Sequence, residues 1–130
     1  MQASKEEQQK AFEDCVLFLL KQGKKSTNEF GCGYRGDNET KCAIGFLIPD
    51  NEYSESFEGL NIIDIREGVW IIPSIEKYST EFLASLQNIH DSIYDDEKSN
   101  FTSLLVENAQ RFATKWKLQM PEVPSENPNG

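Results

Sequence analysis

The clearest helical pattern in the chain lies near its first residues. Ser4 and Glu7 have the spacing of a capping box, in which each side chain accepts a hydrogen bond from the other residue's backbone N–H. Apolar residues then recur every three or four positions; they are Phe12, Cys15, Val16 and Leu19. This is the period of one helix face, and Gly23 offers a stop because glycine readily adopts left-handed backbone. The pattern therefore predicts an amphipathic helix between Ser4 and Gly23.

The last third of the chain predicts two more helices. Ser79 or Thr80 can cap the first of them. Its apolar positions are Phe82, Leu83, Leu86, Ile89 and Ile93. Ser99 or Asn100 can cap the second. Its apolar stripe consists of Phe101, Leu104, Leu105, Ala109, Phe112 and Trp116. Both helices have an apolar face that needs a partner surface.

Between these helices the pattern changes to short apolar runs broken by glycine. Tyr34-Arg35 and Lys41-Cys42 flank residues 36–39, GDNE, whose composition is typical of a tight turn. These residues predict a β-hairpin. Residues 43–48 form an apolar run too short for its period to be read, and either a short helix or a buried strand fits it.

A second hairpin is predicted further along. Residues 60–65 and 69–72 are rich in isoleucine and are separated by Arg66-Glu67-Gly68, which suits a three-residue turn. The elements together predict a single α+β domain over residues 1–120, with an N-terminal helix, one or two short hairpins and two C-terminal helices. Residues 121–130, PEVPSENPNG, offer almost nothing to bury and are expected to form a disordered tail.

Composition and net charge argue against some classes of function. The chain has 130 residues, with 13 basic against 22 acidic residues and a net charge of −9. Such a charge repels phosphate backbones and anionic lipid, which argues against direct binding of nucleic acid or a membrane surface. No apolar run approaches the roughly 20 residues of a membrane span, and the first residues lack the apolar core of a signal peptide. We therefore expect a cytoplasmic protein whose three cysteines are reduced thiols.

One set of residue types could support thiol chemistry. In such a site a histidine takes the proton of a cysteine and a carboxylate orients the imidazole, and Cys42, His90 and Asp91 supply these groups. His90, however, lies among the apolar positions of its predicted helix. Adjacent helical residues project about 100° apart, so Asp91 should be a poor partner for His90. We expect Cys42 to be a buried structural residue.

Metal and cofactor sites have weaker support. Zinc would find enough ligands by count, since Cys15, Cys32, Cys42 and His90 are available. No pair of them has the two-to-four-residue gap of a zinc knuckle. The acidic residues lack the spacing of a calcium loop, and GCGYRG is not followed by the lysine and hydroxyl of a phosphate loop. No metal and no cofactor is therefore expected.

The block from residue 32 to 59 combines glycines, two cysteines and an acidic stretch in an order that no helix or strand period requires. Its motifs are Tyr34-Arg35-Gly36, Lys41 to Gly45, Leu47 to Asp50, Tyr53 and Glu58-Gly59. With LQNIHD at residues 86–91, they resemble a set of small proteins encoded by bacteriophages and prophages. The resemblance implies a phage origin and brings no particular reaction with it.

The structural motif of this block consists of Tyr34, Arg35, Gly36, Lys41, Cys42 and Gly45. The side chains expected to organise the block are those of Tyr34, Arg35, Lys41, Tyr53 and Glu58. Among them, Arg35 should bind a carboxylate or loop carbonyls rather than reach solvent, because the planar guanidinium can serve several acceptors at once.

The distribution of charge suggests a binding surface. No basic residue lies between Lys41 and Arg66, and Asp91, Asp95, Asp96 and Glu97 form a second acidic cluster. One interpretation is ordinary solvated surface; the other is an anionic face that attracts a basic partner. The candidate binding residues are Asp50, Glu52, Tyr53, Glu55, Glu58 and Asp64.

Two functional hypotheses follow. The leading one is a small acidic phage-type interaction protein that binds and inhibits a basic host protein, either a nucleic-acid enzyme or an antiviral defence component. The resemblance to phage proteins favours it, since carboxylates on a surface can mimic nucleic-acid phosphates. The alternative is a small cysteine-dependent enzyme that uses Cys42 and His90.

Overall fold

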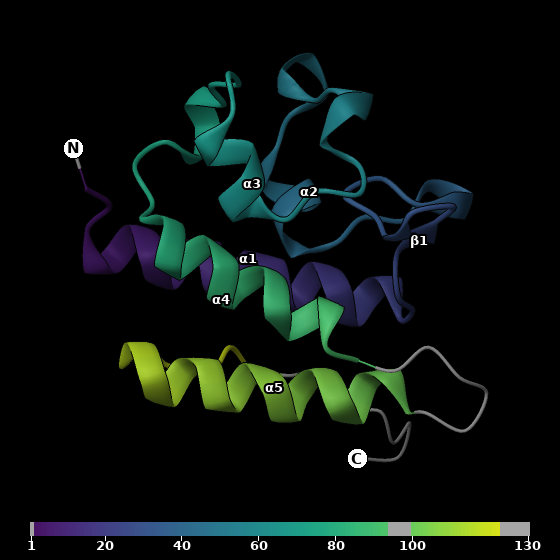
Figure 1. The fold of residues 1–130 in the computed structure, drawn as a ribbon. Helices are drawn as coiled ribbons and strands as arrows, with labels where there is room; N and C mark the ends of the chain where they lie inside the picture. Colours follow the sequence, from purple (N-terminus) through teal and green to yellow (C-terminus); the bar gives the residue numbers. More distant parts are fainter. Residues whose placement is uncertain (1, 94–99, 123–130) are drawn as a thin grey trace.

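Three long helices lie along one side of the molecule, and a layer of short elements covers them (Figure 1). The computed structural model describes residues 2–93 and 100–122. The long helices are α1 (Lys5–Gln22), α4 (Thr80–Asp91) and α5 (Phe101–Trp116). The short elements are β1 (Thr27–Asn28), β2 (Gly31–Cys32), η1 (Asp37–Glu39), α2 (Ala43–Leu47), η2 (Asp50–Glu52), η3 (Glu55–Phe57), α3 (Ile62–Glu67) and η4 (Pro73–Ile75).

The ends of the long helices follow the predicted caps. Ser4 and Glu7 form the capping box of α1, and Gly23 ends this helix at a positive φ of 72°. Ser79 caps α4 and Asn100 caps α5, each through a side-chain oxygen that accepts a backbone N–H. The other proposed cap of α5, Ser99, lies outside the described residues.

Aromatic side chains join the three long helices. The rings of Phe12 in α1 and Phe112 in α5 stack with centroids 4.9 Å apart. Phe82 in α4 meets Phe112 edge to face at 5.4 Å and Trp116 at 5.2 Å. Because Phe12 and Phe82 are fully buried, this cluster forms the centre of the helical side of the core.

The predicted α+β class and single domain are confirmed, although the strands lie elsewhere. The two-stranded antiparallel sheet pairs β1 with β2, which the sequence pattern did not indicate. At the predicted first hairpin only one bridge forms, between Arg35 and Lys41, because η1 occupies the turn between them. The ambiguous run at residues 43–48 forms helix α2 and its C-cap.

The prediction of a second hairpin is wrong. Residues 62–67 form helix α3, because Asn61 and Asp64 make a capping box and because Ile62 and Ile65 are buried at helical spacing. Residues 69–72 belong to no strand that the structure describes.

The expectations about a membrane span and about the C-terminal tail can be compared only with the described residues. No helix within it is both long and apolar enough to cross a bilayer. Residues 123–130 of the expected tail lie outside it.

Gly45 marks the tightest approach between two segments of the block. A Cβ atom at this position would overlap the backbone carbonyl oxygen of Tyr34, which has no room to move. We therefore expect Gly45→Ala to lower the free energy of unfolding by about 1–3 kcal/mol, as overpacking does. The measurement is urea denaturation followed by circular dichroism.

Gly68→Ala is the comparison for this prediction. There the added methyl would meet the ring of Trp70 at 2.9 Å, and the nearest backbone atom, the carbonyl oxygen of Ile65, lies 3.4 Å away, so the conflict is milder than at Gly45. A Gly45→Ala protein as stable as the native chain would show that α2 and residue 34 do not pack as described.

Candidate functional site

The carboxylate of Glu58 connects the parts of the block. Oε1 accepts hydrogen bonds from Asn28 Nδ2 at 2.8 Å and from the backbone N–H of Tyr34 at 3.0 Å. Oε2 accepts from the backbone N–H of Arg35 at 3.0 Å and from the Tyr53 hydroxyl at 2.6 Å. Hydrogen bonds to an ionised acceptor are the strong ones, so this side chain holds three separate segments together.

Arg35 makes the contacts that its sequence context predicts. Its Nη1 donates to Asp50 Oδ1 at 2.6 Å and its Nη2 donates to the carbonyl oxygen of Ile48 at 2.9 Å. The guanidinium also lies over the ring of Tyr53, 4.5 Å from its centroid. The hydrogen bond from Arg35 lowers the pKa of Asp50. The prediction that this arginine serves a carboxylate and a loop carbonyl is therefore confirmed.

Two other acidic residues among the candidate binding residues also accept hydrogen bonds from the chain itself. Both oxygens of Glu52 serve Ser74, one accepting from its backbone N–H at 2.9 Å and the other from its hydroxyl at 2.8 Å. Asp64 accepts from the backbone N–H of Asn61 in the capping box of α3. Of the six candidate binding residues, only Glu55 has a side chain that makes no hydrogen bond with a described residue. The second acidic cluster is not placed by the structure, because Asp95, Asp96 and Glu97 lie outside the described residues.

The remaining residues of the block support its packing. The Tyr34 hydroxyl donates to the carbonyl of Leu60 at 2.7 Å and accepts from Gln87 in α4 at 2.9 Å. Burial raises the pKa of Tyr34, so it stays a phenol. The backbone N–H of Lys41 donates to Gln22 at the end of α1. Gly36 lies so close to Ser26 and Thr27 that a side chain would not fit there.

A hollow opens beside this network, between the turn of the β1–β2 hairpin and η3. The residues around it are Asn28, Glu29, Phe30, Arg35, Tyr53, Glu55 and Glu58. Phe30 is 63% exposed at the tip of the turn, and its backbone N–H donates to Asn28 Oδ1 at 2.8 Å. Glu29 and Glu55 are exposed, and their carboxylates make no hydrogen bond with any residue of the described chain. The hollow therefore presents an aromatic ring beside two uncommitted carboxylates.

Sequence reasoning missed Glu29 and Phe30. They lie in the segment NEFG between β1 and β2, and Phe30 is the one aromatic residue in the polar stretch from residue 24 to 33. An aromatic side chain in a turn of polar residues was the available signal, because a turn gives such a side chain little chance of burial.

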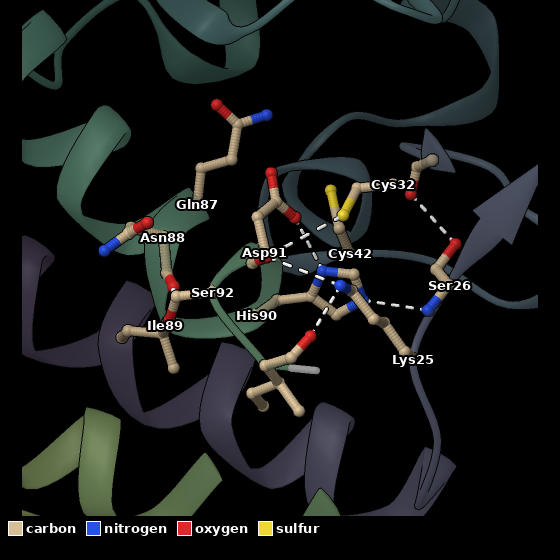
Figure 2. Close-up of polar contacts among 12 residues, drawn as sticks. Lys25, Ser26, Cys32, Cys42, Gln87, Asn88, Ile89, His90, Asp91 and Ser92 are labelled. Carbon is tan, nitrogen blue, oxygen red and sulfur yellow. Dashed lines mark hydrogen bonds and ion pairs between the residues drawn. The ribbon is translucent and has the colours of Figure 1, made fainter. Parts of the chain in front are cut away.

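A second polar cluster surrounds His90, which is fully buried (Figure 2). The backbone N–H of Ser26 lies 2.8 Å from Nε2, and Asp91 Oδ1 lies 2.7 Å from Nδ1. A backbone N–H can only donate, so Nε2 is the acceptor of the bond from Ser26. The imidazole proton therefore lies on Nδ1, which donates a hydrogen bond to Asp91 Oδ1. Asp91 does bind its neighbour, contrary to our expectation, because both side chains are long enough to meet although their Cβ atoms diverge.

Because of these hydrogen bonds, His90 cannot act as a base for the thiol of Cys42 or of Cys32. Cys42 is buried, its sulfur accepts from the backbone N–H of Gly45 at 3.3 Å, and burial raises its pKa. The sulfur of Cys32 lies within 4.8 Å of a ring nitrogen of His90, and burial raises the pKa of that thiol too. Since Ser26 and Asp91 occupy both imidazole nitrogens, neither cysteine can pass a proton to His90. The expected burial of Cys42 is confirmed, and the geometry gives no support to catalysis by Cys42 and His90.

The cluster has the residue types and the proximity of a metal site, but its hydrogen bonds oppose metal binding. Ligand atoms of Cys32, His90 and Asp91 lie within 4.8 Å of one another. A metal bound at Nδ1 would require the proton of the imidazole to sit on Nε2, where it would face the N–H of Ser26. These residues therefore do not fit a metal ion.

The cluster instead fastens the first loop to the end of α4. The ammonium of Lys25 donates to the carbonyl of Ile93 at 2.6 Å, next to the bond between Ser26 and His90. A cation at the C-terminus of a helix also suits the helix dipole. The hairpin that carries Phe30 is thereby anchored at its base.

In comparisons with known proteins, the chain matches no family model, no curated protein and no solved structure. The candidate site therefore rests on its own geometry.

Replacing Glu58 tests the role of its carboxylate. In Glu58→Gln one of the two accepting oxygens becomes an NH₂ group, which can only donate and therefore opposes the donors around it. We expect the free energy of unfolding to fall by about 2–4 kcal/mol, because hydrogen bonds to charged groups are strong. Glu55→Gln is the matched control, since an exposed substitution without partners changes stability by only about 0.5 kcal/mol. Urea denaturation measures both, and equal stability of the two variants would contradict the assignment.

Replacing Arg35 separates a structural role from a contact role. Arg35→Ala and Arg35→Lys should both lower the melting temperature, because an ammonium cannot reach Asp50 and Ile48 together as the guanidinium fork does. Thermal unfolding measured by calorimetry shows the effect. An unchanged melting temperature in both variants would mean that these contacts contribute nothing to stability.

Proposed function

We propose that this chain is a non-enzymatic interaction protein of phage type that binds and inhibits a basic host protein. The observation that carries the proposal is the hollow of Phe30, Glu29 and Glu55. It places an exposed aromatic ring beside carboxylates that no described residue of the chain engages.

The hollow is preorganised for binding. Tyr53, on its wall, is held by the carboxylate of Glu58 and by the guanidinium of Arg35. Burial, and then the bond to Glu58, raise the pKa of Tyr53, which therefore remains a phenol. A wall that is already fixed loses little side-chain entropy when a partner binds, and this favours affinity. Aromatic anchors of this kind supply much of the binding energy in protein interfaces.

The charge of the hollow selects the partner. The carboxylates of Glu29, Glu55 and Glu58 surround it, and the one cation among the residues that line it, Arg35, is paired with Asp50. A lysine or arginine of a partner would find acceptors there, and a net charge of −9 would steer a basic protein toward the chain. Nucleic-acid enzymes and nucleic-acid-sensing defence proteins carry such basic surfaces because they bind phosphate.

The test uses substitutions that the fold tolerates. Charge reversal at Glu52 or Glu58 would break internal bonds, so the informative variants are Phe30→Ala and the pair Glu29→Gln with Glu55→Gln. Partners are captured from host lysate with the native chain and identified by mass spectrometry, and the dissociation constant of the purified partner is then measured. We expect each variant to weaken binding by about tenfold or more, equivalent to about 1.4 kcal/mol.

A charge-matched control distinguishes the hollow from net charge. The pair Glu6→Gln with Glu39→Gln removes the same charge at exposed positions that do not line the hollow. Binding should weaken as salt rises, since the Debye length is about 8 Å at physiological ionic strength. A partner that tolerates Phe30→Ala, or that loses as much affinity with the control pair, would show that the hollow is not the site.

A further inference from the structure

A groove runs between α4 and α5, which lie side by side (Figure 1). Its volume is about 340 Å³, which is within the range of pockets that hold small molecules. Each helix contributes side chains at every third or fourth position, so one face of each helix forms a wall. The described residues around the groove are Ser85, Asn88, Ile89, Ser92, Asn108, Arg111, Phe112 and Lys115.

The apolar residues of the groove belong to the core. Ile89 and Phe112 are only 3% and 5% exposed. Phe112 stacks on Phe12 and meets Phe82 edge to face, so the core fixes its position. An apolar part of a ligand would remove the remaining surface of these side chains from water without any rearrangement of the core.

The groove has the opposite charge to the chain as a whole. The chain carries 22 acidic residues against 13 basic ones, but none of the described residues around the groove is acidic, and Arg111 and Lys115 are cations. Arg111 Nη2 lies 2.5 Å from Glu107 Oε1, and Lys115 Nζ lies 3.8 Å from the carboxylate of Glu81. All four side chains are more than half exposed, so water screens both pairs. An anion in the groove can therefore compete for the two cations.

Neutral donors lie on the facing wall. Lys115 Nζ donates to Ser85 Oγ at 3.3 Å, and the hydroxyl hydrogen of Ser85 has no acceptor among the described residues. The side-chain amide of Asn88 is exposed and makes no hydrogen bond with a described residue. It points away from the His90 cluster (Figure 2). The groove thus offers hydrogen-bond donors from both helices.

Hydrogen bonds between the two helices fix the width of the groove. Asn108 Nδ2 donates to the carbonyl of Ile89 at 3.1 Å and to Ser92 Oγ at 3.0 Å. Ser92 Oγ in turn donates to the carbonyl of Asn88 at 2.7 Å. A ligand would therefore enter a groove that is already formed, which reduces the ordering cost of binding.

From these observations we propose that the groove between α4 and α5 binds a small phosphate monoester that carries an apolar group. The phosphate accepts hydrogen bonds from the guanidinium of Arg111, the ammonium of Lys115 and the hydroxyl of Ser85. The apolar group lies over Ile89 and Phe112. A phosphate suits these donors better than a carboxylate does, because it has three strong acceptor oxygens. The groove shares no residue with the hollow and does not rest on the proposed function.

The charge of the chain favours a free small molecule over a nucleic-acid strand. A strand would extend beyond the two cations, and its further phosphates would meet a chain with a net charge of −9. A single phosphate responds mainly to charges within a Debye length, about 8 Å at physiological ionic strength. The cations of Arg111 and Lys115 line the groove itself and so act within this distance.

The test titrates the full chain with adenosine 5′-monophosphate (AMP), adenosine and inorganic phosphate in a calorimeter. Adenosine lacks the phosphate and inorganic phosphate lacks an apolar group, so we expect AMP to bind about tenfold more tightly than either. In NMR spectra AMP should shift the backbone amide signals of Ser85, Asn88 and Arg111 and leave that of Phe30 unchanged. This mapping uses the native chain and does not depend on the folding of any variant.

Three variants and one control complete the design. Arg111→Gln and Lys115→Gln each remove a cation, and Asn88→Asp introduces a carboxylate. All three positions are exposed, so the variants should fold normally and bind AMP about fivefold more weakly. Lys10→Gln is the matched control, because it makes the same change in net charge and breaks an exposed pair with Asp14 at the same helical spacing as the pair of Arg111. Lys10 does not line the groove, so this variant should bind AMP as the native chain does.

Each contrary result overturns the proposal. Absence of saturable binding at about 10 mM AMP means that the groove holds no such ligand. Equal binding of adenosine excludes recognition of the phosphate, and equal binding of inorganic phosphate excludes recognition of the apolar group. An equal loss in Lys10→Gln shows that only net charge matters. Shifts at Phe30 in place of those at Ser85 put AMP in the hollow.

Discussion

The arrangement of the short elements depends on one carboxylate, that of Glu58. Its four hydrogen bonds include two from consecutive backbone N–H groups, of Tyr34 and Arg35, which fix the direction of the chain there. The other two come from Asn28 beside the hairpin turn and from Tyr53. A buried or half-buried carboxylate requires such donors because it loses hydration as the fold closes around it. The wall of the hollow is therefore a consequence of satisfying this charge.

The acidity of the chain has two physically different parts. Asp50, Glu52, Glu58 and Asp64 accept hydrogen bonds within the fold and so contribute to its stability. Glu29, Glu55, Glu67 and Glu76 are exposed, and no described residue donates a hydrogen bond to their carboxylates. Only carboxylates of the second kind remain available to a partner, and two of them, Glu29 and Glu55, lie beside the exposed ring of Phe30.

A row of buried and half-buried rings supports the wall of the hollow. The rings of Tyr53, Phe57 and Trp70 meet edge to face in turn, with centroids 5.9 Å and 5.8 Å apart. Phe57 at the centre is buried, whereas Phe30, Val69 and Ile71 project from the supported elements into solvent. Substitution of the exposed Phe30 can therefore report on binding without removing the core that supports the hollow.

Sequence alone determined the parts of this protein that depend on neighbours close in the chain. The ends of α1 and α4 follow from Ser4, Gly23 and Ser79, because a cap acts within one helical turn. It did not determine residues 60–72, where a short run of isoleucines fits a helix or a strand equally well and burial against the rest of the fold decides. It also could not show which carboxylates are occupied or that Ser26 and Asp91 take both nitrogens of His90. Those outcomes depend on groups as far as 64 residues apart, which only the tertiary structure brings within hydrogen-bonding distance.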